Sequence, residues 1–285
     1  MTPQRSWAPG VGVVLALGAC VGASAQEDQV LVAVRARLDE LVRRDPSAYV
    51  SCDMELTVGP FGTALTTLDV WSRDRQHYRA EDTHNSVVVV TPEEMKLYNA
   101  PWGMMLHVPA ETVPGLEPKQ QGPLALLGFG TPEATLGLLE EFSGELTRSG
   151  ECVVGDVPCW AFSAGPRMRE TARELVGLFC SGPWQVEVTL LDVFLEQGTA
   201  LPRGMHLDAS LSSPQGLAVN LTLDLTVREL ELGVDVTDDM LTFTPPAETT
   251  DVIEWTSETP IDDVSAFLMG IVFAMVRGGG GNFVP

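Results

Sequence analysis

The residues that could do chemistry are few in this chain, and they form no catalytic pattern. His77 and His84, with Asp74, Glu81 and Asp82 nearby, could be drawn as a metal cluster. A spacing of seven residues would put the two histidines on opposite faces of one strand, so we expect no metal site. The sequence also lacks a nucleophile elbow, a P-loop, a His-Glu-x-x-His motif and a dinucleotide-binding fingerprint. We therefore expect a protein without catalytic activity and without a cofactor.

The cysteines are the second chemically active group, and their number favours disulfides. The chain has five cysteines, of which Cys20 stands in the N-terminal leader. The other four form an even set, as expected in an oxidising compartment: Cys52, Cys152, Cys159 and Cys180. A zinc site is the alternative, but no Cys-x-x-Cys unit is present.

The spacing of two of these cysteines predicts how they pair. Residues 152–159 have the pattern of a hairpin around a two-residue Gly155-Asp156 turn. That register places Cys152 directly opposite Cys159, at a Cα spacing that a disulfide can bridge. We predict this bond, and by elimination a second bond between Cys52 and Cys180.

The composition restricts the class of partner. Seventeen Lys and Arg face 39 Asp and Glu, so the formal net charge is -22. Such a chain would repel nucleic acid and would not read an anionic membrane through basic residues. With 45% hydrophobic and 20% charged residues, it has the composition of a folded globular protein and not of a disordered one.

The N-terminus has the features of an export signal. Residues 1–25 contain Arg5, an apolar stretch over 11–17 and the small residues Ala23-Ser24-Ala25, which is typical of a secretory signal peptide. The stretch Leu17-Gly18-Ala19-Cys20 also resembles a lipobox, in which cleavage leaves a lipidated Cys20. Both alternatives predict an exported protein, either periplasmic or anchored to a membrane.

The periodicity of the remaining chain predicts sheet bracketed by helices. Amphipathic spacing indicates helices over 27–44, 131–142 and 167–179. Alternation of apolar and polar residues indicates half-buried strands over 50–58, 63–72, 77–81, 86–91, 95–99, 151–163, 184–195, 205–211 and 217–228. A change of phase near Leu190-Leu191 predicts a bulge, and residues 100–130 read as a long loop with a short hairpin. We expect an α+β fold in which a curved antiparallel sheet forms an incomplete, half-open barrel and helices cover its concave face.

Several short motifs, taken in order, resemble a known family. They are Met54-Glu55-Leu56-Thr57-Val58, Leu68-Asp69-Val70-Trp71, residues 76–81, residues 87–91, Met95-Lys96-Leu97-Tyr98, residues 201–205 and residues 241–246. Their order and spacing resemble the LolA and LolB-like outer-membrane lipoprotein carriers. This resemblance implies a half-barrel with helices in its mouth over residues 26–248, and it places Arg79 where the carriers have an arginine that contacts the lid. Residues 249–285 have no counterpart in the family.

The predicted site is an apolar concave surface. We expect it to be lined by Met54, Leu56, Leu68, Val70, Trp71, Leu97, Met105, Leu221, Leu223 and Leu225. The alternative is that the same residues form an ordinary closed core. The apolar stretch 264–276 in the C-terminal extension is too short to span a bilayer, and we expect a core helix, a plug in the half-barrel or an interfacial segment.

These observations lead to three hypotheses about function, the last of which is an unrecognised hydrolase. The first is a carrier that binds a lipid or lipoprotein acyl chain in the half-barrel without catalysis. The second is an envelope sensor or adaptor that uses the same fold to bind a protein partner.

Overall fold

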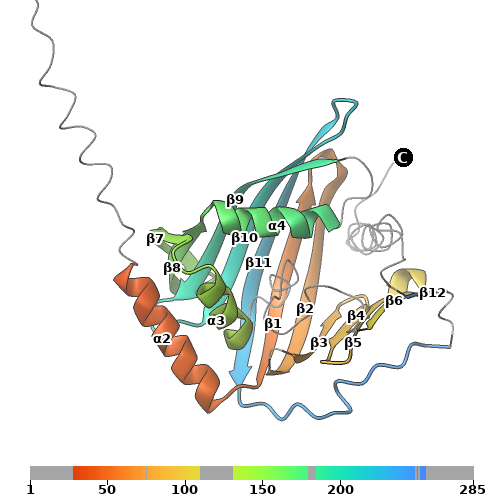
Figure 1. Ribbon diagram of the computed structural model, residues 1–285, viewed down its shortest axis with the longest axis horizontal. Helices are drawn as coiled ribbons and strands as arrows, with labels where there is room; N and C mark the ends of the chain where they lie inside the picture. The colour runs from red at the N-terminus through yellow and green to blue at the C-terminus, as the bar shows by residue number, and fades with distance from the viewer. Residues whose placement is uncertain are drawn as a thin grey trace, which may run out of the picture.

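The computed structural model describes residues 28–74, 76–109, 131–178, 184–247, 249 and 251–254. These residues form one large sheet with helices gathered on one of its sides (Figure 1). The helices are α2 (Gln29–Arg44), α3 (Pro132–Glu141) and α4 (Pro166–Leu178), with short 3-10 turns η1 (Gly59–Phe61) and η2 (Ala100–Trp102). The strands are β1 (Ala48–Val58), β2 (Gly62–Asp74), β3 (His77–Asp82), β4 (Val87–Val90), β5 (Glu94–Asn99), β6 (Met104–Pro109), β7 (Leu146–Val154), β8 (Val157–Ala164), β9 (Gln185–Glu196), β10 (Pro202–Ser212), β11 (Ala218–Leu232) and β12 (Asp251–Glu254).

The sheet is open and almost entirely antiparallel. Its strand order is β12-β6-β5-β4-β3-β2-β1-β11-β10-β9-β8-β7, so in the described part of the chain β12 and β7 form its two edges. Among the strands that the structure describes, only β12, which pairs with β6, runs parallel to its neighbour. The predicted α+β class with an incomplete barrel is confirmed.

Local sequence signals account for the ends of the helices. Asp28 caps α2, and its side chain accepts a hydrogen bond from the Val30 amide at 2.8 Å. Thr131 caps α3 in the same way, through the Ala134 amide at 3.2 Å, and Pro132 occupies the first turn, where no amide donor is needed. The start at Thr131 and Pro132 was predicted from these residue types, whereas α2 was predicted from its amphipathic spacing over 27–44 and not from Asp28.

The predicted hairpin and bulge are also present. Strands β7 and β8 pair with Cys152 opposite Cys159 and Val154 opposite Val157, which leaves Gly155 in the turn at a φ of 59°. On β9 the register shifts at Thr189, one residue before the predicted position, because Leu190 pairs with Asp208 and Val188 pairs with Ala209.

The inner face of the sheet is the side on which the three helices pack. It is defined by strand positions such as Val50, Val70, Leu207, Val193 and Phe162, which all belong to one buried apolar cluster. The helices contribute the following buried residues to the same cluster: Leu31, Val34 and Leu38 from α2; Leu136, Leu138 and Leu139 from α3; and Met168, Ala172 and Val176 from α4. This periodic burial of one stripe on each helix fixes the helices against the sheet.

The outer face of the sheet is polar over most of its extent and carries a different cover. After β11 the chain continues as an irregular segment, residues 233–247, which we call the strap. In Figure 1 the strap is the blue trace that leaves β11 and runs toward β6 and β12. Phe243 of the strap packs against a small buried cluster made by Val87, Val89, Tyr98 and Met105. The outer face of β4–β6 thus has its own minor core.

The C-terminal part of the chain differs from expectation. Residues 251–254 lie in the predicted extension beyond the carrier-like region, yet they form β12 and extend the sheet at β6. Strand β6 falls in the segment 100–130 that was predicted to be mainly loop. The division into a leader, a half-barrel and an extension stays a prediction. The predicted signal peptide, Cys20, Cys180 and the apolar stretch 264–276 lie outside the described residues.

Candidate functional site

The structure brings most of the predicted lining residues together on the inner face. Cross-strand pairing places Met54 beside Leu225 and Leu56 beside Leu223, because residues directly opposite in an antiparallel pair share a face. By the same rule, Val70 and Leu97 share the inner face, because successive cross-strand pairs connect them from β2 to β5. The inner-face members of the predicted set are Met54, Leu56, Leu68, Val70, Leu97, Leu221, Leu223 and Leu225.

Two predicted lining residues lie on the other face. Trp71 pairs with Tyr49 and Arg79 on the outer face, one position away from the inward Val70. Met105 pairs with Tyr98 and belongs to the small cluster under the strap. A strand alternates its side chains with a period of two, so neither residue can line a surface with Val70 and Leu97.

Burial on the inner face changes from one end of β1 to the other. At the end near the helices, Val50 and Cys52 are fully buried in the main core. Toward the β1–β2 turn, Leu56 and Ala64 form a small cluster whose neighbours Leu221 and Leu223 stay half-buried and also pack against the main core. We call this second region, made by Met54, Leu56, Val58, Ala64, Leu221 and Leu223, the distal apolar patch.

Arg79 contacts a different element from the one implied by the family resemblance. Its guanidinium donates to the carbonyl oxygens of Met240 at 3.1 Å and Thr242 at 3.2 Å, and it lies 6.0 Å from the centre of the Phe243 ring. It also pairs with Glu81 on the neighbouring outer position of β3. These partners belong to the strap and the outer face, so Arg79 holds the strap and not the helical cover of the inner face.

A second arginine holds the strap in the same way. Arg73 donates to the Val236 carbonyl oxygen from Nε at 3.1 Å and from Nη2 at 2.9 Å, and it bonds Asp238 at 2.7 Å. These charge-assisted hydrogen bonds satisfy carbonyl oxygens of the strap, which has no strand pairing of its own. Sequence reasoning missed Arg73 because its partners are 163 and 165 residues away, and no local pattern marks them.

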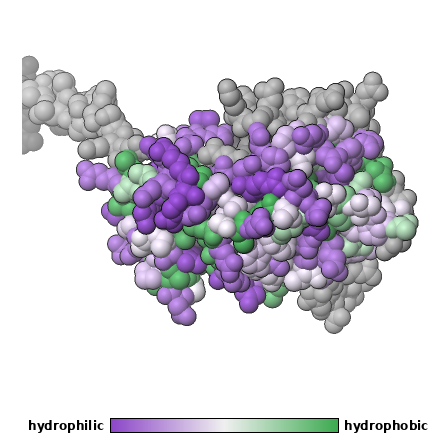
Figure 2. All heavy atoms as spheres, turned by 90° about the horizontal axis from the view of Figure 1, so that it is seen from below, coloured by the Kyte–Doolittle hydropathy of each residue, from purple (hydrophilic) through white to green (hydrophobic). Residues whose placement is uncertain are grey.

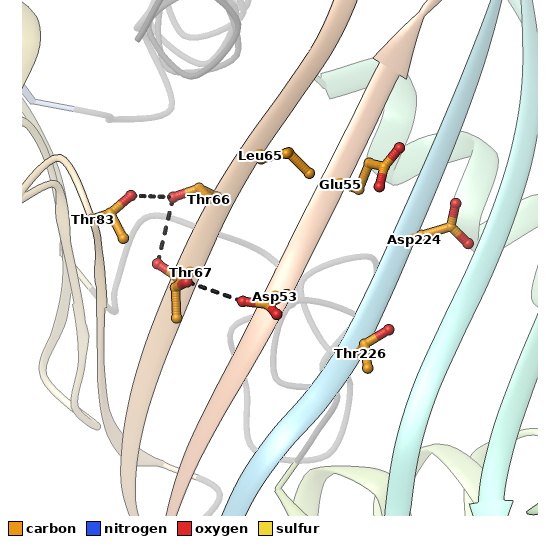
Figure 3. Close-up of a pocket in the computed structure, with 8 residues that line it drawn as sticks. All are labelled: Asp53, Glu55, Leu65, Thr66, Thr67, Thr83, Asp224 and Thr226. Carbon is orange, nitrogen blue, oxygen red and sulfur yellow. Dashed lines mark hydrogen bonds between the residues drawn. The ribbon is translucent and has the colours of Figure 1, made fainter. Parts of the chain in front are cut away.

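The outer face carries a polar groove of about 480 Å³ across β2, β1 and β11 (Figure 3). Eight residues line it: Asp53, Glu55, Leu65, Thr66, Thr67, Thr83, Asp224 and Thr226. Thr67 donates to Asp53 at 3.0 Å, and the hydroxyls of Thr66 and Thr83 are 2.9 Å apart. Three carboxylates line the groove; Asp53 pairs with Arg228 at 3.3 Å and Asp224 with His206 at 2.6 Å, which reduces the negative charge of the groove but leaves Glu55 to add to it.

A histidine with two carboxylate partners lies beside this groove. His206 Nδ1 is 2.6 Å from Asp224, and its Nε2 is 3.2 Å from Asp208, which also accepts a bond from Thr222 at 2.7 Å. Burial alone would lower the pKa of His206, but its two carboxylate partners outweigh burial and raise that pKa above its ordinary value. The bond from Thr222 and the charge of His206 lower the pKa of Asp208. Both ring nitrogens face carboxylate oxygens, an arrangement that favours the protonated form of the imidazole.

The described cysteines are free thiols without the features of a nucleophile. Cys152 and Cys159 occupy the predicted register, but the predicted disulfide itself is not formed in this structure. Burial raises the pKa of Cys52 to about 12 and that of Cys159 to about 11, which keeps both protonated near neutral pH. Within the ranges that the structure describes, no group of three or more His, Cys, Asp and Glu side chains could hold a metal ion. No helix in those ranges is long and apolar enough to cross a membrane.

Figure 2 shows the surface that faces the viewer when the molecule is seen from below. Hydrophilic side chains cover most of it, with hydrophobic ones between them. This distribution agrees with a chain whose charged residues lie largely outside the sheet core.

Comparisons with known proteins give a likeness of fold. No protein-family model and no curated protein matches the chain. Similar solved structures include a chain of the MucA/MucB complex of Pseudomonas aeruginosa, at 15% identity and a TM-score of 0.36, with 75% of this chain and 62% of that chain covered. A LolA superfamily protein of Nitrosomonas europaea matches at 10% identity and a TM-score of 0.34, over 77% of this chain and 99% of that one. The lipoprotein LppX of Mycobacterium tuberculosis matches at 11% identity and a TM-score of 0.35, over 74% and 98%.

Proposed function

We propose that this chain is an exported protein that binds an acyl chain of a lipid or lipoprotein on the distal apolar patch, without catalysis. The observation that carries the proposal is the gradient along the inner face. Helices bury one end of the apolar stripe, whereas Met54, Leu221 and Leu223 at the other end stay half-buried. A half-buried apolar surface inside a curved sheet is a place where a hydrocarbon can be shielded from water.

The energetics of the patch suit an acyl chain. Each methylene that leaves water contributes about 0.8 kcal/mol. Burial of about ten methylenes would give a gross gain of about 8 kcal/mol, the scale of micromolar binding before the cost of ordering the chain. Leucine and methionine side chains make no directional contacts with a ligand. We therefore expect the affinity to depend more on the length of the acyl chain than on the chemistry of its head group.

The acidic outer face would not compete for such a ligand. An ionised fatty acid or an anionic phospholipid carries net negative charge, and the groove lined by Asp53, Glu55 and Asp224 would repel it. Cys52 and Cys159 are buried, and burial raises the pKa of both thiols, which supports a binding protein over a thiol enzyme.

A titration with a fluorescent fatty acid tests the proposal. Leu223→Asn places an amide on the distal apolar patch and should weaken binding about tenfold, since a buried polar group without a partner opposes apolar contact. Leu65→Asn is the matched control, because Leu65 is 61% exposed on the outer face of the adjacent hairpin. Equal affinity of both variants and the parent, or no binding by the parent at any chain length, would contradict the proposal.

A protein-binding role is the second candidate, and the outer groove favours it. Its carboxylates and exposed Leu65 would fit an extended partner segment whose lysine or arginine side chains combine a cation with an aliphatic stem. Binding of a lysine-rich peptide should weaken when Glu55 becomes Gln and when salt rises. A salt-independent affinity would argue against this groove as the contact.

A further inference from the structure

The sheet has two borders in the described part of the chain, and the longer one is β7. Figure 1 shows β7 and β12 at opposite ends of the sheet. Among the described strands β7 pairs only with β8, and it spans nine residues, whereas β12 spans four. Most side chains of β7 are exposed, and only that of Leu146 is buried. A border strand of this length presents a row of main-chain donors and acceptors that another strand can bind.

The turn between β7 and β8 shows which main-chain groups of β7 face away from the sheet. Val154 and Val157 close a two-residue turn, so this pair exchanges hydrogen bonds, and bonded pairs recur at every second residue of β8. At the other end of the hairpin the Gly165 amide donates to the Glu145 carbonyl oxygen, which fits the same alternation. The outward row of β7 therefore consists of the residues opposite the skipped positions of β8, namely Leu146, Arg148, Glu151 and Val153.

A bulge places the two charged residues of this outward row on one face of the sheet. Arg148 pairs with Phe162 and Glu151 pairs with Trp160, so a step of three residues on β7 corresponds to a step of two on β8. Phe162 and Trp160 both pack in the main core on the inner face. Arg148 and Glu151 therefore share the inner side of β7, whereas in a strand without a bulge they would lie on opposite faces.

The outward row is complementary to a second copy of itself. When two β7 strands lie antiparallel about a two-fold axis at the bulge, Arg148 of each copy faces Glu151 of the other. Leu146 then faces Val153 of the other copy, and Val153 is 66% exposed in the single chain. Both lie on the inner side as well, because their partners on β8 belong to the same alternate set. Opposite charges and apolar side chains that face each other in this way stabilise a strand pair.

The charges around the outward row permit such a contact. Arg148 lies 3.4 Å from the Asp28 carboxylate, but both side chains are partly exposed, so this pair contributes little. A guanidinium has several donors and can bind a second carboxylate. The net charge of -22 opposes the approach of two copies. At physiological ionic strength, however, charges farther apart than about 8 Å are largely screened.

We propose that the β7 border is a self-association surface, through which two copies of this chain join their sheets in antiparallel register. The contact involves one strand from each copy and little apolar area, so we expect a weak dimer in the micromolar range. The distal apolar patch and the outer groove lie on β1, β2 and β11, which β8, β9 and β10 separate from β7. The dimer therefore does not depend on ligand binding at either site.

Charge reversal in the outward row tests the register. Sedimentation velocity over a range of protein concentrations measures the dissociation constant of the dimer. Arg148→Glu should weaken the dimer about tenfold, because the new carboxylate faces Glu151 of the other copy. Glu151→Arg should weaken it by a similar factor, because two cations then face each other. A mixture of these two single variants should form a mixed dimer, since every facing pair is again opposite in charge.

The double variant Arg148→Glu with Glu151→Arg is the matched control for the loss of the Asp28 contact. It lacks the native arginine, yet it should dimerise like the parent because its facing pairs are opposite in charge. A parent that stays monomeric at the highest concentration would overturn the proposal. Single variants that dimerise like the parent, or a mixture of them that stays monomeric, would also overturn it.

A cross-link separates this border from any other contact between copies. In the same register Thr147 faces Cys152 of the other copy, at a Cα spacing that a disulfide can bridge. Every sample carries Cys159→Ser, so that Cys152 cannot pair within its own hairpin, and oxidised glutathione serves as the oxidant. Thr147→Cys should give a covalent dimer in which peptide mapping joins positions 147 and 152. Thr189→Cys is the matched control, because Thr189 is exposed on β9, away from the border. Equal cross-linking of the control, or no link between positions 147 and 152, would contradict the proposed register.

Discussion

The inner and outer faces of the same strands differ in chemistry and in how they are covered. On β1 the inward residues Val50, Met54 and Leu56 alternate with the outward residues Asp53 and Glu55. Three helices cover the inner face with a periodic apolar stripe, whereas the strap covers the outer face of β4–β6 with the ring of Phe243 and is held by Arg73 of β2 and Arg79 of β3. The comparison shows that burial of apolar area holds the helices on the inner face. Hydrogen bonds to the backbone contribute more to holding the strap than to holding the helices.

This difference also separates the possible ligands. A hydrocarbon suits the inner face, where the distal apolar patch is left half-buried. A cationic segment suits the outer face, where carboxylates line the groove. One sheet can therefore present two unlike surfaces because side chains alternate along each strand.

The largest expected effect comes from the inner core. Phe162 is fully buried on β8, and its neighbour Ser163 points to the outer face, where it donates to Asp192 at 2.6 Å. Phe162→Ala should lower the free energy of unfolding by about 3–5 kcal/mol, because it removes packing and leaves a cavity. Ser163→Ala should cost about 0.5–1.5 kcal/mol. Urea denaturation of both variants measures the two changes in the free energy of unfolding. Similar losses of stability in both variants would contradict the distinction between the two faces.

An intermediate effect is expected at the strap. Arg79→Ala removes the donors to the Met240 and Thr242 carbonyls and should cost about 1–3 kcal/mol of local stability. Hydrogen exchange should then speed up over residues 236–243 and stay unchanged in α2. Arg228→Ala serves as the control, since Arg228 makes only an exposed 3.3 Å pair with Asp53. Faster exchange across the whole sheet would mean that the strap is part of the main core.

The smallest effect depends on pH. The raised pKa of His206 means that its contribution is complete below the ordinary value of 6.5 and is lost as pH rises through the folded-state pKa. The lowered pKa of Asp208 means that its contribution is present above the ordinary value of 3.8 and is lost as pH falls. The cost of His206→Gln should therefore be largest between these two values, and below about 1 kcal/mol because the groups are partly exposed. Thermal melts from pH 3 to pH 9 test this, and a cost that grows above pH 8 would contradict the network.

Local patterns predicted most of the fold. Alternation located β1, β2, β10 and β11, and the residue types at Thr131 and Pro132 located the start of α3. The Cys152–Cys159 register followed from a two-residue turn, because such a turn fixes the pairing on both sides. The disulfide between these residues stays a prediction.

The remainder depends on contacts between distant residues. Strand β12 and the strap are set by Arg73, Arg79 and the parallel pairing with β6, which no local period encodes. Trp71 and Met105 were predicted to lie on the inner surface because they are apolar. The strand period, however, points Trp71 to the face of the sheet opposite to that of its neighbour Val70. Careful use of that period would have excluded Trp71 from the site. The outer groove combines residues from β1, β2 and β11 and could not be seen before the strand order was known.

Native mass spectrometry with lipid extraction tests the central claim most directly. The protein should be purified gently from its own cell envelope, as the parent and as Leu223→Asn. The account predicts one acyl-bearing molecule on each parent chain and a reduced adduct on the variant. A bare parent chain, or an adduct that survives unchanged in Leu223→Asn, would contradict acyl binding on the distal apolar patch.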